Sequence, residues 1–158
     1  MMATWRLRRA TLDDADALAA LVNRAYGKYV ARIGRPPLPM TADYSEAVGR
    51  DMVWLIEGED GLAATIVLVP DTRSGRLCIE NVAVEPELQG NGLGRRLMRF
   101  AEEEARRLGF DTLYLYTNEA MTENIDLYTR LGYRETHREQ LKGRRAVFME
   151  KAVKSETA

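Results

Sequence analysis

The chain has few of the residues that mark several common protein classes. It contains one cysteine, Cys78, and one histidine, His137. An internal disulfide is therefore excluded, and a metal site would need mainly carboxylates, so no metal is expected. A single cysteine suits a reducing cytoplasm, which is the expected location. No apolar run approaches the roughly 20 residues of a membrane span, and the N-terminus lacks a signal-peptide core, so we expect no membrane association.

The chain also has no surplus of charge of either sign. It carries 23 Lys and Arg against 24 Asp and Glu, a formal net charge of −1, which predicts no bulk attraction to nucleic acid. With 46% apolar residues, 158 residues are enough for one domain with one core. We expect this domain over residues 1–150, followed by a tail without fixed structure over 151–158. The sequence is compatible with either a monomer or a homodimer.

The most informative stretch is Leu77–Leu108. Its first part, Leu77–Val84, is apolar and β-branched except for Glu80 and Asn81, and Pro86 ends the predicted strand. Apolar residues at helical spacing then predict an amphipathic helix. Backbone N–H groups and the positive end of the helix dipole meet at its N-terminus, where glycines leave room for an anion. The turn between strand and helix reads Gln89-Gly90-Asn91-Gly92-Leu93-Gly94.

This glycine turn does not fit the two best-known phosphate-binding motifs. No Lys-Ser/Thr follows Gly94, as a P-loop requires, and the Gly-x-Gly-x-Gly spacing differs from that of a Rossmann fingerprint. The turn resembles motif A of the GCN5-related N-acetyltransferases, Gln/Arg-x-x-Gly-x-Gly/Ala. The resemblance implies binding of coenzyme A pyrophosphate by Gln89, Gly90, Asn91, Gly92, Leu93, Gly94 and Arg95. Two alternatives are a tight strand–helix connection without a ligand and a nucleotide-binding regulator.

The rest of the chain predicts the element order β-α-α-β-β-β-α-β-α-β-β. We expect strands at 5–8, 52–57, 62–69, 77–84, 112–116, 133–136 and 146–149, and helices at 12–30, 41–48, 93–108 and 122–131. The strands up to Val84 should be antiparallel, and the helix between 77–84 and 112–116 should make that pair parallel. This order also resembles the acetyltransferase fold. The resemblance implies a single α/β domain with a mixed, twisted sheet whose parallel strands splay after Val84, leaving a cleft for the cofactor.

A second stretch carries the candidate general acid. Asn124 and Tyr128 are four residues apart, so both lie on one face of the predicted helix. Together with Leu131-Gly132-Tyr133 they resemble motif B of the same family. The resemblance implies that Asn124 bonds the pantetheine arm and that Tyr128 protonates the departing thiolate. The alternative places Tyr128 in the core as an ordinary aromatic residue.

An amine acceptor must lose a proton before it attacks, because its pKa is about 10.4. Glu80 is the candidate base, and we expect its position in an apolar strand to desolvate it partly and raise its pKa. In histone-type members the base lies further upstream, where this chain has Cys78, on the same strand face. Glu80 could instead orient Arg or Tyr side chains. The family pattern also implies that the strand backbone holds the cofactor through Val82, Ala83 and Val84.

These residues predict an enzyme that moves the acetyl group of acetyl-CoA directly to a primary amine. A non-catalytic acyl-CoA sensor of the same fold is the alternative. We expect the acceptor to pass a cationic rim, which would favour a small amine that also carries an anionic group. The alternative is that the arginines of this rim are surface charges paired with Asp43, Glu46, Glu135 and Glu139. The candidate rim residues are Arg32, Arg35, Tyr44 and Arg145, with Lys142 and Arg144 beside the last.

Overall fold

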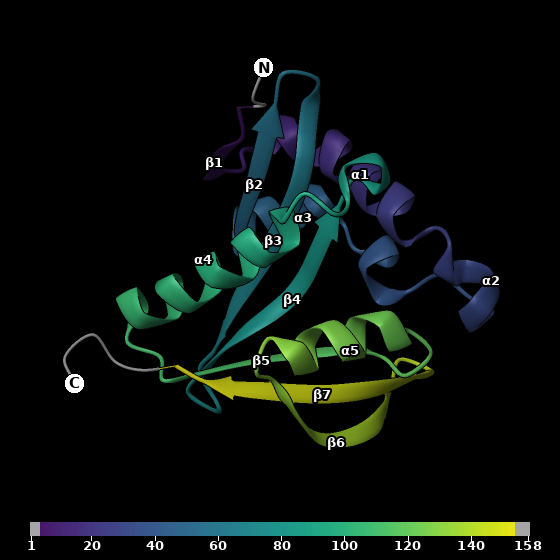
Figure 1. Cartoon of the computed structure of the whole chain (residues 1–158), viewed down its shortest axis with the longest axis vertical. Helices are drawn as coiled ribbons and strands as arrows, with labels where there is room; N and C mark the ends of the chain where they lie inside the picture. The colour runs from purple at the N-terminus through teal and green to yellow at the C-terminus, as the bar shows by residue number, and fades with distance from the viewer. Residues whose placement is uncertain (1–3, 154–158) are drawn as a thin grey trace. The chain divides into compact units, whose positions relative to one another are not determined.

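Seven strands form one mixed sheet in the order β1-β2-β3-β4-β5-β7-β6 (Figure 1). The computed structural model describes residues 4–153, and all statements below concern that range. The strands are β1 (Arg6–Arg9), β2 (Met52–Gly58), β3 (Gly61–Asp71), β4 (Arg76–Val84), β5 (Thr112–Asn118), β6 (Arg134–Leu141) and β7 (Arg144–Ala152). The helices are α1 (Ala15–Tyr26), α2 (Tyr29–Ile33), α3 (Tyr44–Arg50), α4 (Leu93–Leu108) and α5 (Thr122–Arg130). The expected α/β fold with a mixed sheet is confirmed.

The described chain divides into two compact units. The first unit comprises residues 4–69 and 80–100, and the second comprises 70–79 and 101–153. The chain crosses from the second unit to the first within β4, between Ile79 and Glu80. The first unit therefore holds the predicted glycine turn, and the second holds the predicted motif B.

In the first unit, β1, β2 and β3 pair in antiparallel order, as predicted. Leu7 lies opposite Ile56, and Val53 lies opposite Val67. Helix α1 buries one face because its apolar residues recur every three or four positions. The core side chains with less than 2% exposure include Leu18, Leu21 and Val22 from α1, Leu55 and Ile56 from β2, Ile66 and Leu68 from β3, and Leu97 from α4.

The first predicted helix, 12–30, is divided into three pieces. Leu12–Asp14 forms a single 3₁₀ turn, α1 follows, and α2 begins at Tyr29 after a break at Gly27 and Lys28. The Asp14 carboxylate stabilises the start by accepting the N–H of Thr11 at 2.8 Å. Arg8 also donates to it twice, at 2.9 Å each, and this pairing lowers the pKa of Asp14 to about 2.

The helix predicted to begin at Thr41 begins at Tyr44, after a separate 3₁₀ turn at Leu38–Thr41. The reason is a side-chain cap, because one carboxylate oxygen of Asp43 accepts the N–H groups of Ser45 and Glu46 at 3.0 and 3.2 Å. The β1–β2 connection contains three α-helices, α1 to α3, and two 3₁₀ turns, whereas the sequence predicted two helices.

In the second unit, β4 and β5 form the predicted parallel pair. The register joins Leu77–Ile79 with Leu113–Leu115, while β5–β7 and β6–β7 are antiparallel. The turn between β6 and β7 is shorter than predicted, because both Lys142 and Gly143 adopt positive φ and close a two-residue hairpin. The splay after Val84 stays a prediction.

The predicted start of the C-terminal tail, at Lys151, is too early. Lys151 and Ala152 are the last residues of β7, where Ala152 pairs with Thr112. Val153 is buried, and its N–H donates to the carbonyl oxygen of Asp111 at 2.8 Å. The boundary at residue 150 is therefore wrong by at least these residues, and 154–158 lie outside the described range.

Candidate functional site

The glycine turn leads directly into the N-terminus of α4. Gly90 and Gly92 have φ angles of 90° and 80°, a left-handed conformation that other residues adopt only at a cost. The Arg96 N–H donates to the Gly92 carbonyl at 3.0 Å, so Gly92 is the residue immediately before the helix. The N–H groups of the first helical turn have no intrahelical acceptor. The exposed turn therefore presents backbone donors to solvent.

Neither the backbone conformation nor the packing around Gly94 requires a glycine at this position. Its φ lies outside the left-handed region, and an added Cβ would make only ordinary contact, at 3.7 Å, with Cγ2 of Val84. Glycine inside a helix costs about 1 kcal/mol relative to alanine. The missing side chain leaves room for an anion at the helix N-terminus, which is compatible with the predicted phosphate site.

The charge at this helix end also fits an anion. Arg95 is exposed, and none of the carboxylates in residues 4–153 pairs with it. Arg96 points elsewhere, since its guanidinium donates to the Trp5 carbonyl at 3.2 Å. Helix α4 contributes its macrodipole over 16 residues. The turn thus combines backbone donors, one uncommitted cation and open space.

The N–H and C=O groups at the end of β4, beside this turn, point in directions that one hydrogen bond to β3 defines. The Glu85 N–H donates to the Ala63 carbonyl of β3 at 2.8 Å. Backbone groups alternate between the two edges of an extended strand, so those of Val82 and Val84 point to the edge away from β3. This parity matches the expected use of the Val82 and Val84 N–H groups. The side chain of Ala83 is buried, so that residue contributes packing here.

Two side chains from the first unit bind the carbonyl groups at that edge. The Tyr26 hydroxyl donates to the Val82 carbonyl at 2.8 Å, and Gln89 donates its side-chain amide to the Val84 carbonyl at 3.4 Å. Gln89 therefore links the turn to the strand. Asn91 closes the turn by donating to the Leu88 carbonyl at 2.8 Å.

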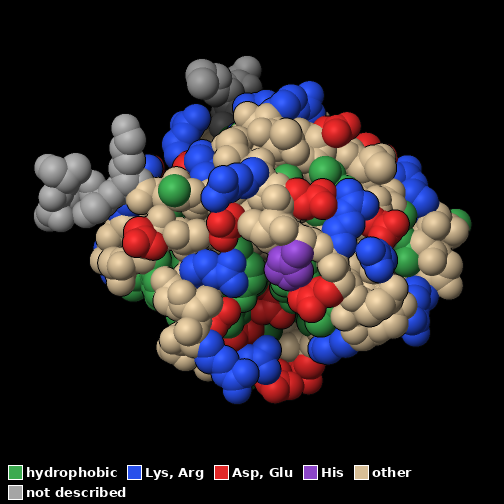
Figure 2. Space-filling view, turned by 90° about the horizontal axis from the view of Figure 1, so that it is seen from below, with side chains coloured by type: hydrophobic (Ala, Val, Ile, Leu, Met, Phe, Trp, Pro, Cys, Tyr) green, Lys and Arg blue, Asp and Glu red, His purple; other side chains and the backbone are tan. Residues whose placement is uncertain are grey.

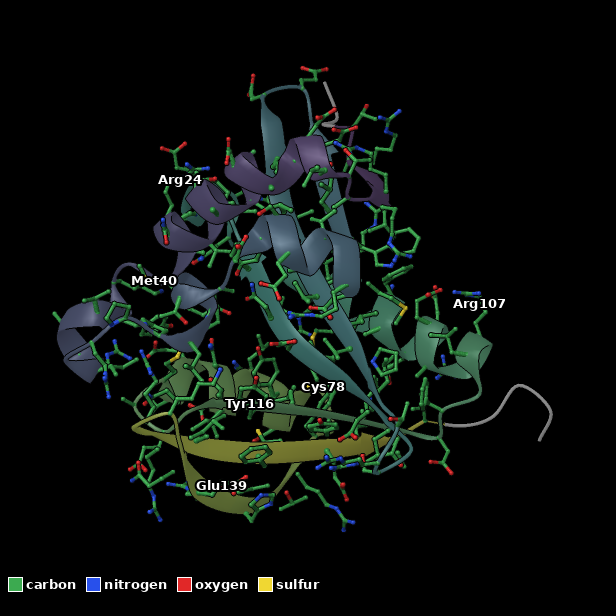
Figure 3. The ribbon with its side chains drawn as sticks, turned by 180° about the vertical axis from the view of Figure 1, so that it is seen from behind. Arg24, Met40, Cys78, Arg107, Tyr116 and Glu139 are labelled. Atoms are coloured by element: carbon green, nitrogen blue, oxygen red, sulfur yellow. The ribbon has the colours of Figure 1, made fainter. Side chains whose placement is uncertain are left out.

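Glu80, the candidate base, is exposed, contrary to the expected partial desolvation. Cys78, two residues earlier on β4, is buried instead (Figure 3). Glu80 does act on its surroundings, because its negative charge adds to the effect of burial in raising the pKa of Tyr44. The base argument for Glu80 therefore rests on its place in the strand, and desolvation does not support it.

Tyr44 is a core residue, which contradicts its expected place on the acceptor rim. It is 5% exposed, and its hydroxyl donates to the Pro39 carbonyl at 2.8 Å. The same hydroxyl accepts the side-chain amide of Asn81 at 2.9 Å. Sequence reasoning missed Asn81 and Tyr26 as functional candidates. The available signal was Asn81 itself, a polar side chain in an otherwise apolar strand.

In the second unit, Asn124 and Tyr128 lie on α5 as predicted. Tyr128 is buried, and burial raises its pKa to about 12, so the phenol keeps its proton throughout the neutral range. Its ring lies edge-on to that of Tyr133, with centroids 6.1 Å apart. The Tyr133 hydroxyl is also buried and has no hydrogen-bond partner in the described structure.

The C-terminal end of α5 is held by a residue that the sequence placed in the tail. The Lys151 ammonium donates to the Leu131 carbonyl at 2.8 Å and pairs with Glu102 of α4 at 2.7 Å. A cation at this end satisfies an unpaired carbonyl and complements the helix dipole. Lys151 therefore stabilises the helix that carries Tyr128.

The rim residues belong to different units. Arg32 and Arg35 are exposed in the first unit, and the Arg32 guanidinium lies 5.1 Å from the ring centroid of Tyr29. Arg145 is exposed in the second unit and pairs with Glu119 at 3.1 Å, instead of the suggested Glu135 or Glu139. The charged side chains of both signs are intermingled on the face shown in Figure 2.

Two further structural observations bear on the class of protein. Within residues 4–153, no group of three or more His, Cys, Asp and Glu side chains could hold a metal ion. No helix in the same range is long and apolar enough to cross a membrane. The candidate site features in the described residues are the turn before α4, the side of β4 that faces away from β3, and the face of α5 that carries Asn124 and Tyr128.

A glycine turn at a helix N-terminus, beside a strand whose Val82 and Val84 backbone groups point away from β3, is the arrangement predicted for an acyl-CoA-dependent acyltransferase. The family model described as "Acetyltransferase (GNAT) family" matches residues 16–133. Streptothricin acetyltransferase of Streptomyces lavendulae is 36% identical over 154 residues, covering 82% of each chain. The uncharacterized N-acetyltransferase YjgM of Escherichia coli is 28% identical over 135 residues, covering 80% of each. The chain belongs to the GNAT acetyltransferase family, and an acetyl-CoA-dependent enzyme is confirmed at that level.

Solved structures show the same fold. Nourseothricin acetyltransferase matches with a TM-score of 0.74 at 25% identity, covering 95% of this chain and 99% of that one. A second match, YncA from Salmonella typhimurium, was solved with acetyl-CoA as its cofactor. It has a TM-score of 0.72 at 22% identity, covering 98% of this chain and 96% of that one.

Proposed function

We propose that this protein transfers the acetyl group of acetyl-CoA directly to a primary amine on a small molecule. The observation that carries the proposal is the turn before α4. Neither the backbone conformation nor the packing at Gly94 requires glycine. Arg95 is exposed and has no carboxylate partner in residues 4–153. Bound acetyl-CoA would supply an acetyl group activated as a thioester. The turn from Gln89 to Arg95 would hold its pyrophosphate, and the N–H groups of Val82 and Val84 would bind the acetyl carbonyl and the pantetheine arm.

Each of the two proton transfers has its own proposed residue. Tyr128 is the proposed general acid, because burial keeps its phenol protonated until the sulfur departs. Asn124 is the proposed hydrogen-bond partner of the pantetheine arm. Glu80 is the proposed base, acting directly or through a water molecule. Its exposure suits a carboxylate that passes a proton to solvent.

The first acceptor candidate is a small amine that also carries an anionic group. The exposed guanidinium groups of Arg32, Arg35 and Arg145 support it by adding positive charge. A relative named aminoalkylphosphonate N-acetyltransferase, from Salmonella typhimurium, has such an acceptor in its name. It is 36% identical over 59 residues, which cover 37% of this chain. Arg145 contributes less than expected, because its pairing with Glu119 partly neutralises it.

The second candidate is a streptothricin. The observation in its favour is the longer similarity to streptothricin acetyltransferase, 36% identity over 82% of the chain. One acceptor panel that contains both kinds of amine can separate the two candidates.

The test has two stages. Calorimetry with coenzyme A and ATP should show binding of coenzyme A and none of ATP, and the reverse would support a nucleotide-binding regulator. Thiol release from acetyl-CoA is then measured with amino acids, aminoalkylphosphonates, polyamines, aminoglycosides, N-terminal peptides and streptothricin, at two ionic strengths. Binding without turnover on any amine would support the sensor. Turnover of streptothricin, or no loss of acceptor affinity with added salt, would overturn the anionic-amine candidate.

A further inference from the structure

Helix α1 contacts the C-terminal part of β4 and the residue that follows it. Arg24 (labelled in Figure 3) forms a two-point pair with Glu85, with both N–O distances at 2.8 Å. Tyr26, two residues later, reaches β4 itself. Its hydroxyl lies 2.9 Å from the side-chain oxygen of Asn81 and 2.8 Å from the Val82 carbonyl. Tyr26 is only 8% exposed, so these bonds are shielded from water.

These two contacts flank one backbone group. Along the chain, the N–H of Val82 lies between the Asn81 side chain and the Val82 carbonyl. The phenol of Tyr26 bonds to both of these groups. Because the phenol is rigid and packed, it restricts rotation of the peptide planes on either side of that N–H. The Val82 carbonyl points away from β3, so the N–H of the same residue is fixed toward that edge as well.

The contact with the backbone does not depend on the orientation assigned to the Asn81 amide. As assigned, the one hydroxyl hydrogen of Tyr26 is shared between the Asn81 oxygen and the Val82 carbonyl. With the amide turned over, its nitrogen would donate to Tyr26, and the hydroxyl hydrogen would go wholly to Val82. In both cases the phenol bonds the strand backbone.

We propose that Tyr26 is a positioning residue for acetyl transfer, which fixes the direction of the Val82 N–H through paired contacts with the Asn81 side chain and the Val82 carbonyl. This proposal rests on the proposed function, in which that N–H binds the acetyl carbonyl. A donor aimed in advance at a developing negative charge needs no reorganisation during the reaction, so loosening it should slow the chemical step more than it weakens cofactor binding.

The test compares Tyr26→Phe with Tyr114→Phe. Each variant loses one tyrosine hydroxyl, and that of Tyr114 donates to Asp71 at 3.0 Å within the second unit. Hydrogen exchange of the unliganded protein should become faster in a peptide covering residues 80–84 in Tyr26→Phe only. In steady state, Tyr26→Phe should lower kcat by about 10- to 100-fold, because a misplacement of about 1 Å costs up to 10²-fold. The KM for acetyl-CoA should change less than about twofold, because the other proposed contacts with the cofactor remain.

Equal losses of kcat in the two variants would indicate general destabilisation and overturn the proposal, as would an unchanged kcat in Tyr26→Phe. Unchanged exchange at residues 80–84 would also overturn it. A wild-type protein that neither binds coenzyme A nor acetylates any amine would instead overturn the proposed function. The exchange measurement would then still show whether Tyr26 fixes this part of β4.

Discussion

Gly94 lies beside Val84, and a methyl group added at Gly94 would rest 3.7 Å from Cγ2 of that valine. The fold thus has room for alanine at this helical position, and its backbone does not demand glycine. Because neither packing nor backbone conformation requires glycine at this position, a substitution there tests directly whether a ligand approaches the backbone.

We therefore predict that Gly94→Ala leaves folding stability equal or raises it by up to about 1 kcal/mol, the helix-propensity difference. The same change should weaken coenzyme A binding at least about tenfold, equivalent to 1.4 kcal/mol, by placing a methyl group against the phosphate. Urea unfolding and calorimetry measure the two effects. Gly49→Ala in α3, where an added Cβ meets nothing within 4 Å, is the matched control and should retain full affinity. Full affinity in Gly94→Ala would contradict the phosphate site.

The second prediction separates charge from backbone strain at Gly92. Its φ of 80° penalises any side chain, although Asn and Asp tolerate this region better than most residues. Gly92→Asn and Gly92→Asp have nearly the same shape and differ by one negative charge. We expect Gly92→Asp to bind coenzyme A at least about tenfold more weakly than Gly92→Asn, with the gap narrowing in salt. Equal affinities would refute electrostatic recognition at this turn.

The third prediction concerns Tyr128. Tyr128→Phe should lower kcat by about 10²–10⁴-fold, the usual contribution of a general acid, and leave acetyl-CoA affinity nearly unchanged. Because the pKa of Tyr128 is raised to about 12, the wild-type rate should show no loss from its deprotonation below about pH 11. Tyr133→Phe is the control, since it removes a buried hydroxyl without a partner in the described structure and should not destabilise the fold. Equal kcat in the wild type and Tyr128→Phe would return Tyr128 to a packing role.

The fourth prediction tests Glu80 as the base. Glu80→Gln should reduce the rate most at low pH, where the acceptor amine is more fully protonated and removal of its proton matters most. The pH–rate profile should therefore become steeper than that of the wild type. Glu59→Gln, an equally exposed carboxylate in the β2–β3 turn, should keep the wild-type profile. Profiles of the same shape for the wild type and Glu80→Gln would show that Glu80 is not the base.

The fifth prediction concerns stability and pH at the start of α1. The pKa of Asp14 is lowered to about 2, chiefly by its hydrogen bonds from Arg8. Because the folded-state pKa is lowered, the Asp14 carboxylate stabilises the folded protein at pH values above the unfolded pKa of 3.8. This stabilisation is lost as pH falls toward 2. Asp14→Asn should therefore cost up to about 2 kcal/mol in urea unfolding at pH 7, and the difference should shrink below pH 4. A difference that does not change with pH would contradict the assigned pairing.

The sequence by itself determined the features that depend on neighbours along the chain. The strand, glycine turn and helix between Leu77 and Leu108 follow from local periodicity and from the conformations open to glycine. The parallel relation of β4 and β5 follows from the length of their crossover. Asn124 and Tyr128 share a helix face because they are four residues apart. These are short-range constraints, so the fold class and the glycine turn before α4 could be predicted, while cofactor binding by that turn stays a prediction.

Only the tertiary structure decided which side chains are buried and which partner each one meets. Tyr44 follows the same helical pattern as a surface residue would, yet Pro39 and Asn81 enclose its hydroxyl. Glu80 lies in an apolar strand and is nevertheless exposed, while Lys151, predicted to belong to the tail, lies in β7 and donates to the Leu131 carbonyl at the end of α5. The Tyr26–Val82 bond joins residues 56 positions apart. Such contacts depend on how distant segments pack, and hydrophobic periodicity shows only which face of an element is turned inward.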